Sequence, residues 1–339
     1  NGFREAVRLS FRRARAKKPL MTAARQNPGP DGRRDRPPLP AARLESGGAP
    51  ARTPPVPAAV ALALALTLSA FPARPLPAEE GPALGRLAVS GSTTLLPVSM
   101  GLAEIFLKIH PESLMSVSGT GTGEGIKSLV DGVIDVAGAS RDILPAESRL
   151  AAERGVRLVR HLAARDLLAV IVNPENPVTG LTLGQLEGIW LGAYRNWREL
   201  GGDDRAIVAV NRDSSSGTFE LWLELVLKGA RFRRDAQVQP SSGGVAYAVG
   251  GNRSAIGYVG LGFLNRRVKA LSVNGVEPAI ANAADGSYPL SRELYFFTRD
   301  PVPPAARMFL DRLQSPEGRE LLLRDGFLPP ETPLETRLP

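Results

Sequence analysis

The chain of 339 residues contains no cysteine and only two histidines, His110 and His161. Without cysteine, the protein has no disulfide, thiolate metal site, cysteine nucleophile or cysteine-linked lipid anchor. With only two histidines, we expect no histidine-rich metal site and no cofactor. Aromatic residues make up only 6%, whereas 43% hydrophobic and 22% charged residues are typical of a globular protein. The length allows two or three domains.

The net charge of +8 is unevenly distributed along the chain. Residues 1–78 contain 14 Lys/Arg and 4 Asp/Glu, a balance of +10, which leaves a balance of −2 for residues 79–339. The basic character therefore belongs to the N-terminal segment. Because the rest of the chain has no basic pattern typical of nucleic-acid binding, we expect no nucleic-acid partner.

The N-terminal segment shows two successive patterns. Residues 1–57 are rich in Arg, Pro, Gly and Ala and are predicted to be a disordered basic extension, with a basic amphipathic helix over 4–18 as the alternative. The apolar run that follows is shorter than the about 20 residues of a membrane span. Residues 58–78 are therefore predicted to be a secretory signal peptide, cleaved after Ala73 or Ala78, or an uncleaved N-terminal anchor. In both cases we expect the remainder to be periplasmic or otherwise exported.

From residue 85 onward, short apolar strands alternate with helical segments. Strands are predicted at 87–89, 114–117, 134–137 and 207–210. This alternation is typical of an α/β fold with largely parallel sheets. Two further strands, at 157–162 and 167–172, are expected to form a crossover into a second lobe.

Three strand-to-helix junctions are rich in Ser, Thr and Gly: 91–94 (GSTT), 118–125 (SGTGTGEG) and 212–219 (RDSSSGTF). Ligands of parallel sheets bind beyond the carboxyl ends of the strands, against helix N-termini. Hydroxyls, backbone N–H groups and one guanidinium there suit a small tetrahedral oxyanion. The glycine-rich stretch is not a P-loop, because Ile126 separates Gly125 from Lys127. It is not a dinucleotide fingerprint either, because Glu124 stands at the third glycine position.

A serine nucleophile is the competing interpretation of residues 214–216. The sequence has no G-x-S-x-G elbow, and neither histidine lies near a loop of this type. We therefore expect a non-enzyme without catalytic residues, and a phosphatase that uses Ser216 is the less favoured alternative.

Six motifs, in order, resemble the periplasmic phosphate-binding proteins that serve the phosphate ABC transporter. They are GSTTLLP (91–97), SGTGTGEGIKSLVDG (118–132), DVAGASR (135–141), LTLGQLEGIWLG with NW (181–197), RDSSSGTF (212–219) and AIGYVG (255–260). The resemblance covers about residues 85–328. It implies a class II periplasmic-binding fold, in which two lobes, each a mostly parallel sheet flanked by helices, are joined by a two-strand hinge. Inorganic phosphate would lie in the cleft between them.

The resemblance also implies domain boundaries and partners. We expect lobe 1 to comprise residues 85–163 and 268–328, lobe 2 to comprise 164–267, and 329–339 to be a flexible tail. The partner would be the permease of an ABC transporter, and the binding protein would be a monomer. A receptor for sulfate, molybdate or tungstate, and a phosphate sensor without a transport role, stay open as alternatives.

Carried over position by position, the resemblance implies a set of phosphate ligands: Thr94, Leu95 (N–H), Thr122, Gly123 (N–H), Ser140, Arg141, Arg212, Ser216, Gly217 and Thr218. Arg141 stands where many family members have an aspartate that accepts the hydrogen of a protonated phosphate, and a guanidinium cannot accept a hydrogen bond. Either Glu124, Asp142 or Asp213 supplies the acceptor, or selectivity against sulfate is relaxed. Arg141 itself either helps to hold the anion or pairs with a carboxylate outside the cleft.

Overall fold

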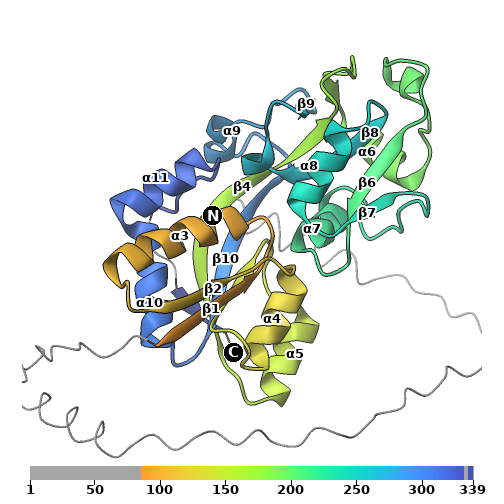
Figure 1. Ribbon diagram of the computed structural model, residues 1–339. Coiled ribbons are helices and arrows are strands. Elements are labelled where there is room, and N and C mark those ends of the chain that lie inside the picture. Colours follow the sequence, from red (N-terminus) through yellow and green to blue (C-terminus); the bar gives the residue numbers. More distant parts are fainter. Residues whose placement is uncertain (1–84, 332–334, 339) are drawn as a thin grey trace, which may run out of the picture. The chain divides into compact units, whose positions relative to one another are not determined.

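The alternation of strands and helices predicted from the sequence is present throughout the computed structural model, which describes residues 85–331 and 335–338 (Figure 1). The predicted basic extension (1–57) and signal or anchor segment (58–78) lie outside these residues. Within the described part of the chain, no helix has both the length and the apolar character needed to cross a membrane.

The first lobe is an α/β layer structure with helices on both faces of its sheet. Its elements are β1 (Arg86–Gly91), α3 (Leu96–Ile109), β2 (Leu114–Val117), α4 (Thr122–Val130), β3 (Val136–Ala139), α5 (Pro145–Glu153), β10 (Ser291–Arg299), α10 (Pro304–Asp311), η3 (Arg312–Gln314) and α11 (Pro316–Arg324). Strands β2, β1 and β3 are parallel, and β10 is antiparallel to β3. Because side chains alternate along a strand, Leu87 packs with α3 and α10 on one face and Ala88 packs with α4 on the other.

The second lobe repeats this layered plan. Its elements are β5 (Gly180–Leu181), α6 (Leu183–Leu191), η1 (Trp197–Leu200), β6 (Val208–Arg212), α7 (Gly217–Leu225), β7 (Gln237–Gln239), α8 (Ser242–Gly250), β8 (Ala255–Gly260), η2 (Leu261–Phe263), β9 (Lys269–Val273) and α9 (Ile280–Ala284). Strand β6 is parallel to both β7 and β8. Trp190, Trp222 and Tyr258 form an aromatic core on one face of the sheet, while Val245 of α8 packs on the other.

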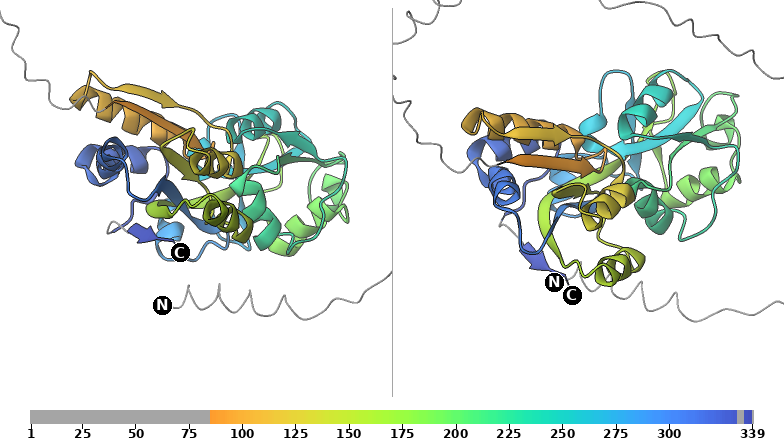
Figure 2. Two further views of the ribbon diagram at one scale, coloured as in Figure 1. Left: turned by 90° about the horizontal axis from the view of Figure 1, so that it is seen from below. Right: turned by 60° about the horizontal axis from the view of Figure 1, so that its bottom comes forward.

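Strand β4 (Leu158–Val172) runs through both lobes as one continuous strand of 15 residues (Figures 1 and 2). Its first part pairs with β10, and its last five residues, from Leu168 on, pair with β8. The prediction of two separate strands interrupted near Asp166 is therefore wrong. The strand continues because Asp166, although charged, has an ion-pair partner in Arg292 on β10.

Residues 268–290 belong to the second lobe, so the predicted return to the first lobe at residue 268 is wrong. Strand β9 pairs with the last residues of β4, and Leu271 lies in the same core as Trp190 and Trp222. Apolar strand sequences do not specify their pairing partner, and this one pairs with β4 and β5. The chain returns to the first lobe with β10, so the lobes are linked by β4 and by the connection into β10.

The chain end is also more ordered than predicted. Residues 335–337 form strand β11 (Glu335–Arg337), which pairs antiparallel with Val159, Arg160 and His161 of β4. The prediction of a flexible tail over 329–339 is therefore wrong for this part, because the edge of β4 offers free backbone groups.

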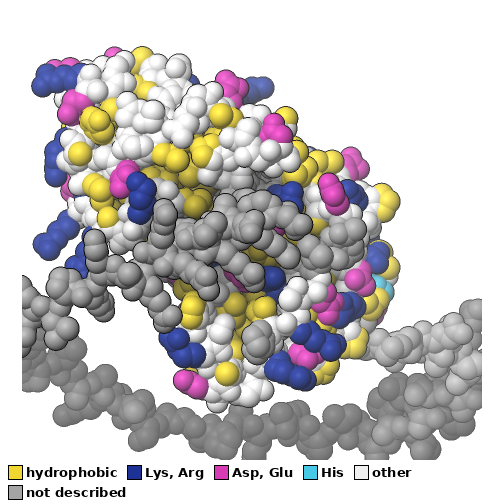
Figure 3. All heavy atoms as spheres, turned by 180° about the vertical axis from the view of Figure 1, so that it is seen from behind, with side chains coloured by type: hydrophobic (Ala, Val, Ile, Leu, Met, Phe, Trp, Pro, Cys, Tyr) yellow, Lys and Arg dark blue, Asp and Glu magenta, His cyan; other side chains and the backbone are white. Residues whose placement is uncertain are grey.

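Charges on the surface are mixed. Over the described residues visible in Figure 3, Lys and Arg side chains lie among acidic and apolar side chains. The described residues contain no group of three or more His, Asp or Glu side chains that could hold a metal ion.

Candidate functional site

Five connections that follow strands bring hydroxyl side chains to one place between the lobes. In the first lobe these connections follow β1, β2 and β3, and in the second lobe they follow β6 and β7. Six buried side chains from these connections form what we call the hydroxyl cluster: Thr93, Thr94, Thr122, Ser140, Thr218 and Ser242. The predicted meeting of the strand-to-helix junctions is thus present in the structure.

The hydroxyl cluster forms a continuous chain of contacts that crosses between the lobes four times. In order, the oxygen–oxygen distances are Thr122–Ser140 3.3 Å, Ser140–Thr218 3.4 Å, Thr218–Thr94 3.2 Å, Thr94–Ser242 3.4 Å and Ser242–Thr93 3.3 Å. Hydroxyl hydrogen bonds are normally 2.5–3.0 Å long, with about 2.7–2.8 Å most common. All five contacts are therefore longer than well-formed bonds, and the hydroxyls satisfy one another poorly.

Close approach of the lobes explains two glycines beside the cluster. Gly121, the N-cap of α4, has φ +102°, and a Cβ there would come 2.3 Å from Ser215 Oγ of the opposite lobe. A Cβ on Gly217 would come 2.7 Å from Thr122 Oγ1 and 3.0 Å from Ser140 Oγ. Both positions need glycine for the lobes to meet as they do.

Arg212 lies at the end of β6 with its side chain 2% exposed, and it donates into one side of the cluster. Its Nη1 donates to Thr93 Oγ1 at 3.1 Å and to Ser242 Oγ at 3.3 Å. Its other donors reach the carbonyls of Gln239 and Pro240 and the carboxylate of Asp213. Burial lowers the pKa of Arg212 from its ordinary value, while Asp213 opposes that change. The guanidinium stays charged because its ordinary pKa lies above 12.

Arg292, at the start of β10, donates into the other side of the cluster. Its Nη1 donates to Thr218 Oγ1 at 2.9 Å, and its Nη2 donates to Thr94 Oγ1 at 3.4 Å. Nε and Nη2 also donate to Asp166 Oδ2 at 2.9 and 2.6 Å. Burial raises the pKa of Asp166, whereas Arg292 and the N–H of Leu261 act against that change.

The chemistry of this arrangement follows from the direction of its hydrogen bonds. A guanidinium only donates, so the four hydroxyls that face Arg212 and Arg292 must each accept. Their own protons then point to neighbouring hydroxyls, at the long distances given above. A buried set of donors without good acceptors is costly. An anion with several oxygens would accept these protons, so the chemistry of the cluster suits a small oxyanion.

The structure brings Thr94, Thr122, Ser140, Arg212 and Thr218 together, as predicted from the sequence. Three of the other predicted ligands, Leu95, Gly123 and Ser216, already have a hydrogen-bond partner of their own. Leu95 N–H donates to Ser92 O at 3.2 Å, Gly123 N–H donates to Ser215 O at 3.0 Å, and Ser216 Oγ accepts from Phe219 N–H at the start of α7. Their role as ligands stays a prediction.

Arg141 departs from its predicted role as a ligand. Its Nη1 and Nη2 each donate to Glu147 at 2.8 Å, and its Nε donates to Glu220. The guanidinium thus faces carboxylates rather than the hydroxyl cluster, which agrees with the alternative expectation of a carboxylate partner. Since Glu147 is on α5 and Glu220 on α7, however, the ion pairs connect the two lobes.

None of the three carboxylates proposed as acceptors for a phosphate hydrogen contacts the cluster. Glu124 is exposed, and Asp142 pairs with Arg160. Asp213 accepts from Arg212 and from the N–H and hydroxyl of Ser215. Burial acts to raise the pKa of Asp213, but these hydrogen bonds outweigh it and lower the pKa.

Four residues of the site were missed from the sequence: Thr93, Asp166, Ser242 and Arg292. Thr93 lies in the first predicted junction, next to Thr94. Ser242 follows strand β7 in the stretch PSSGG, whose composition matches the three recognised junctions. Asp166 and Arg292 are charged residues inside apolar strands, a signal for a buried ion pair that does not reveal the partner.

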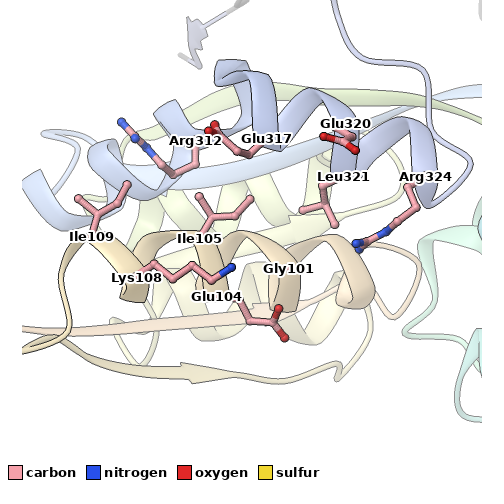
Figure 4. A pocket seen from close by; sticks show the side chains of 10 residues that line it. All are labelled: Gly101, Glu104, Ile105, Lys108, Ile109, Arg312, Glu317, Glu320, Leu321 and Arg324. Carbon is pink, nitrogen blue, oxygen red and sulfur yellow. The ribbon is translucent and has the colours of Figure 1, made fainter.

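An open groove of ≈ 510 Å³ lies apart from the cluster, between the first-lobe helices α3 and α11 (Figure 4). Acidic and basic side chains from both helices line it, together with Ile105, Ile109 and Leu321. It contains no residue of the hydroxyl cluster and does not have the chemistry of an oxyanion site.

Comparisons with known proteins agree with this geometry. The profile of the PBP superfamily domain matches residues 76–317. The phosphate-binding protein PstS of Bacillus subtilis is 31% identical over 252 residues, which cover 74% of this chain and 82% of that protein. A substrate-binding protein from Clostridium perfringens, assigned to a phosphate ABC transporter and solved with bound phosphate, is 32% identical with a TM-score of 0.68. The match covers 73% of this chain and 100% of that one. An ABC-type phosphate transport receptor from Vibrio cholerae is also 32% identical, with a TM-score of 0.59 and coverage of 72% and 100%.

Proposed function

Because this chain belongs to the PstS family of phosphate-binding proteins within the PBP superfamily, we propose that it is the extracytoplasmic receptor for inorganic phosphate of an ABC transporter. In this proposal the anion binds at the hydroxyl cluster between the lobes and is passed to the permease subunits. The family is one of solute-binding proteins.

The single observation that carries the proposal is the buried set of hydroxyls that accept from Arg212 and Arg292. In a desolvated site, fixed N–H and O–H donors stabilise an anion more strongly than they would in water. A small tetrahedral anion can accept from both lobes at once, so binding would favour the closed arrangement.

Phosphate is favoured over sulfate, molybdate and tungstate by what the relatives bind. The Bacillus subtilis relative is named a phosphate-binding protein, and the Clostridium perfringens protein was solved with phosphate. Four of the six motifs that carry the resemblance contribute residues to the cluster.

The receptor would act without catalysis and as an exported monomer. Ser216 Oγ accepts from Phe219 N–H, and His161 Nε2 is hydrogen-bonded to Thr298. Neither histidine of the chain has a hydrogen bond to Ser216 within the described residues, so this serine lacks the adjacent base that a nucleophile needs.

The proposal is tested on the purified protein after bound anions have been removed by unfolding and dialysis. Calorimetry should show one phosphate per chain, and a chromogenic phosphate ester should not be hydrolysed. Stronger binding of sulfate, molybdate or tungstate than of phosphate would overturn the choice of ligand, and turnover of the ester would support the phosphatase. Restored phosphate uptake in cells that lack their own receptor would distinguish transport from sensing.

A further inference from the structure

Arg292 and Asp166 form a buried ion pair at the place where the lobes meet. The two residues are register partners on the antiparallel strands β10 and β4, and their side chains are 2% and 0% exposed. Asp166 accepts from Arg292 through Oδ2 and from Leu261 N–H through Oδ1, at 3.1 Å. The carboxylate of Asp166 therefore holds the guanidinium of Arg292 in place, and the N–H of Leu261 holds the carboxylate.

Stability alone does not account for this pair. The free energy needed to remove two charges from water is about as large as the free energy gained from their attraction. A protein with well-packed apolar residues in place of a buried ion pair is therefore often equally stable or more stable. The position of the remaining donors suggests another role. They reach Thr94, at the start of α3 in the first lobe, and Thr218, in the first turn of α7 in the second lobe.

The hydrogen bonds from Arg292 determine what these two threonines can do. Since a guanidinium cannot accept, both hydroxyl oxygens accept from it and both protons must point elsewhere. The two hydroxyls lie 3.2 Å from each other, too far for a strong bond. An anion between the lobes would accept both protons. Asp166 binds the Nε and Nη2 edge of the guanidinium, which leaves Nη1 to donate to Thr218.

We propose that Arg292, held by Asp166, is a positioning residue of the oxyanion site that orients the Thr94 and Thr218 hydroxyls as donors, one from each lobe. This inference rests on the proposed function and adds to it. Arg212 performs the same task for Thr93 and Ser242, so each guanidinium orients one hydroxyl from each lobe. Anion binding and the meeting of the lobes would then depend on the same two arginines.

The decisive variant is the neutral pair Arg292→Gln with Asp166→Asn, which removes both charges and leaves no unpaired charge in the interior. We expect its Tm to stay close to that of the unmodified protein, while its affinity for phosphate falls by about 10- to 100-fold, as for the loss of hydrogen bonds that involve a charged group. The control is Arg233→Gln. Its side chain is 8% exposed and pairs with Asp235 away from the cluster, and its affinity should not change. A neutral pair that folds and binds phosphate normally would show that the ion pair only joins the strands.

A second variant, Arg292→Lys, covers the case in which the neutral pair does not fold. Lysine keeps the positive charge opposite Asp166. Its single nitrogen, however, cannot replace the separate guanidinium nitrogens that donate to the two threonines. We expect at least about a tenfold loss of phosphate affinity, whereas a purely structural ion pair would leave the affinity unchanged. If the unmodified protein binds sulfate or molybdate instead of phosphate, the proposed function fails, and the same comparison with that anion still tests Arg292. If it binds none of these anions, both proposals fail.

Discussion

Arg141 of the first lobe and Glu220 of the second lobe form an ion pair beside the start of helix α7. Arg141 is 8% exposed and Glu220 is 25% exposed, and Glu147 binds the remaining face of the same guanidinium. Contacts between the lobes exist only when the lobes are together, so this pair stabilises the closed arrangement. Its contribution should therefore be seen in ligand affinity rather than in the stability of either lobe.

Replacement of Glu220 by glutamine should weaken phosphate binding by about five- to thirtyfold, because one partly buried charged hydrogen bond across the lobes is lost. Calorimetry measures this loss. The matched control is Arg160→Gln, which breaks the pair with Asp142 inside the first lobe and should leave affinity unchanged. Equal affinities for all three proteins would mean that the ion pair does not contribute to closure.

The Gly217→Ala substitution should keep the lobes apart. The added methyl group would lie 2.7 Å from Thr122 Oγ1 and 2.9 Å from Arg141 Cγ, both in the opposite lobe. We expect phosphate affinity to fall by about 100-fold or more without loss of Tm, since alanine favours the helix in which it would lie. Gly184→Ala in α6 is the control, because its nearest contact would be an ordinary 3.9 Å. Small-angle scattering with saturating phosphate should show a more extended Gly217→Ala protein, and a radius equal to that of the control would contradict the prediction.

The Thr218→Val substitution removes one hydroxyl and keeps the shape of the side chain. Thr218 Oγ1 accepts from Arg292 and contacts both Thr94 and Ser140, so its loss removes the central donor of the cluster. We expect phosphate affinity to fall by about tenfold or more. Thr298→Val is the control. Thr298 is buried on β10, but its hydroxyl is bonded to His161 rather than to the cluster. If both valine variants lose affinity equally, the effect comes from the fold and not from the site.

Acid should destabilise the protein through His161. Burial lowers its pKa from 6.5 to about 4, with Glu335 acting to raise it and Arg307 to lower it. Well above pH 6.5 the side chain is neutral in both the folded and the unfolded state. As the pH falls from 6.5 to 4, the unfolded state takes up a proton that the folded state does not. The free energy of unfolding should therefore fall by about 3 kcal/mol across this window.

The control for this pH dependence is His161→Gln, which cannot titrate. Urea unfolding of both proteins at several pH values gives the difference between them, so the contributions of the carboxylates cancel. The difference should change between pH 6.5 and 4 and be constant above pH 7. A difference that does not depend on pH would contradict the prediction.

The meeting of the strand-to-helix junctions is predicted correctly, because it depends on short, local sequence patterns. A strand followed by Ser, Thr and Gly and then a helix identifies Thr94, Thr122 and Thr218, since parallel strands bring such junctions to one edge. The final partners of a side chain are not local information. The sequence around Arg141 does not show that it pairs with Glu220. The two residues come together only in the folded protein, where they lie in different lobes.

The errors in the fold have the same origin. In the sequence, the charge of Asp166 predicts an interruption of the strand. Its partner Arg292 is 126 residues away, so the local sequence does not show that the charge is paired. The sequences of β9 and β11 do not indicate that both strands pair with β4. The alternation that defines an α/β protein is predicted correctly, whereas lobe boundaries depend on pairings that the sequence leaves open.

Strand β11 also has a practical consequence for anyone who prepares this protein. The three residues Glu335–Arg337 cover backbone groups of Val159, Arg160 and His161 that would otherwise face solvent. A recombinant version that stops before residue 335 would expose an unpaired sheet edge, which favours association with other chains. A recombinant version should therefore keep residues 335–337, so that size-exclusion profiles report the natural oligomeric state.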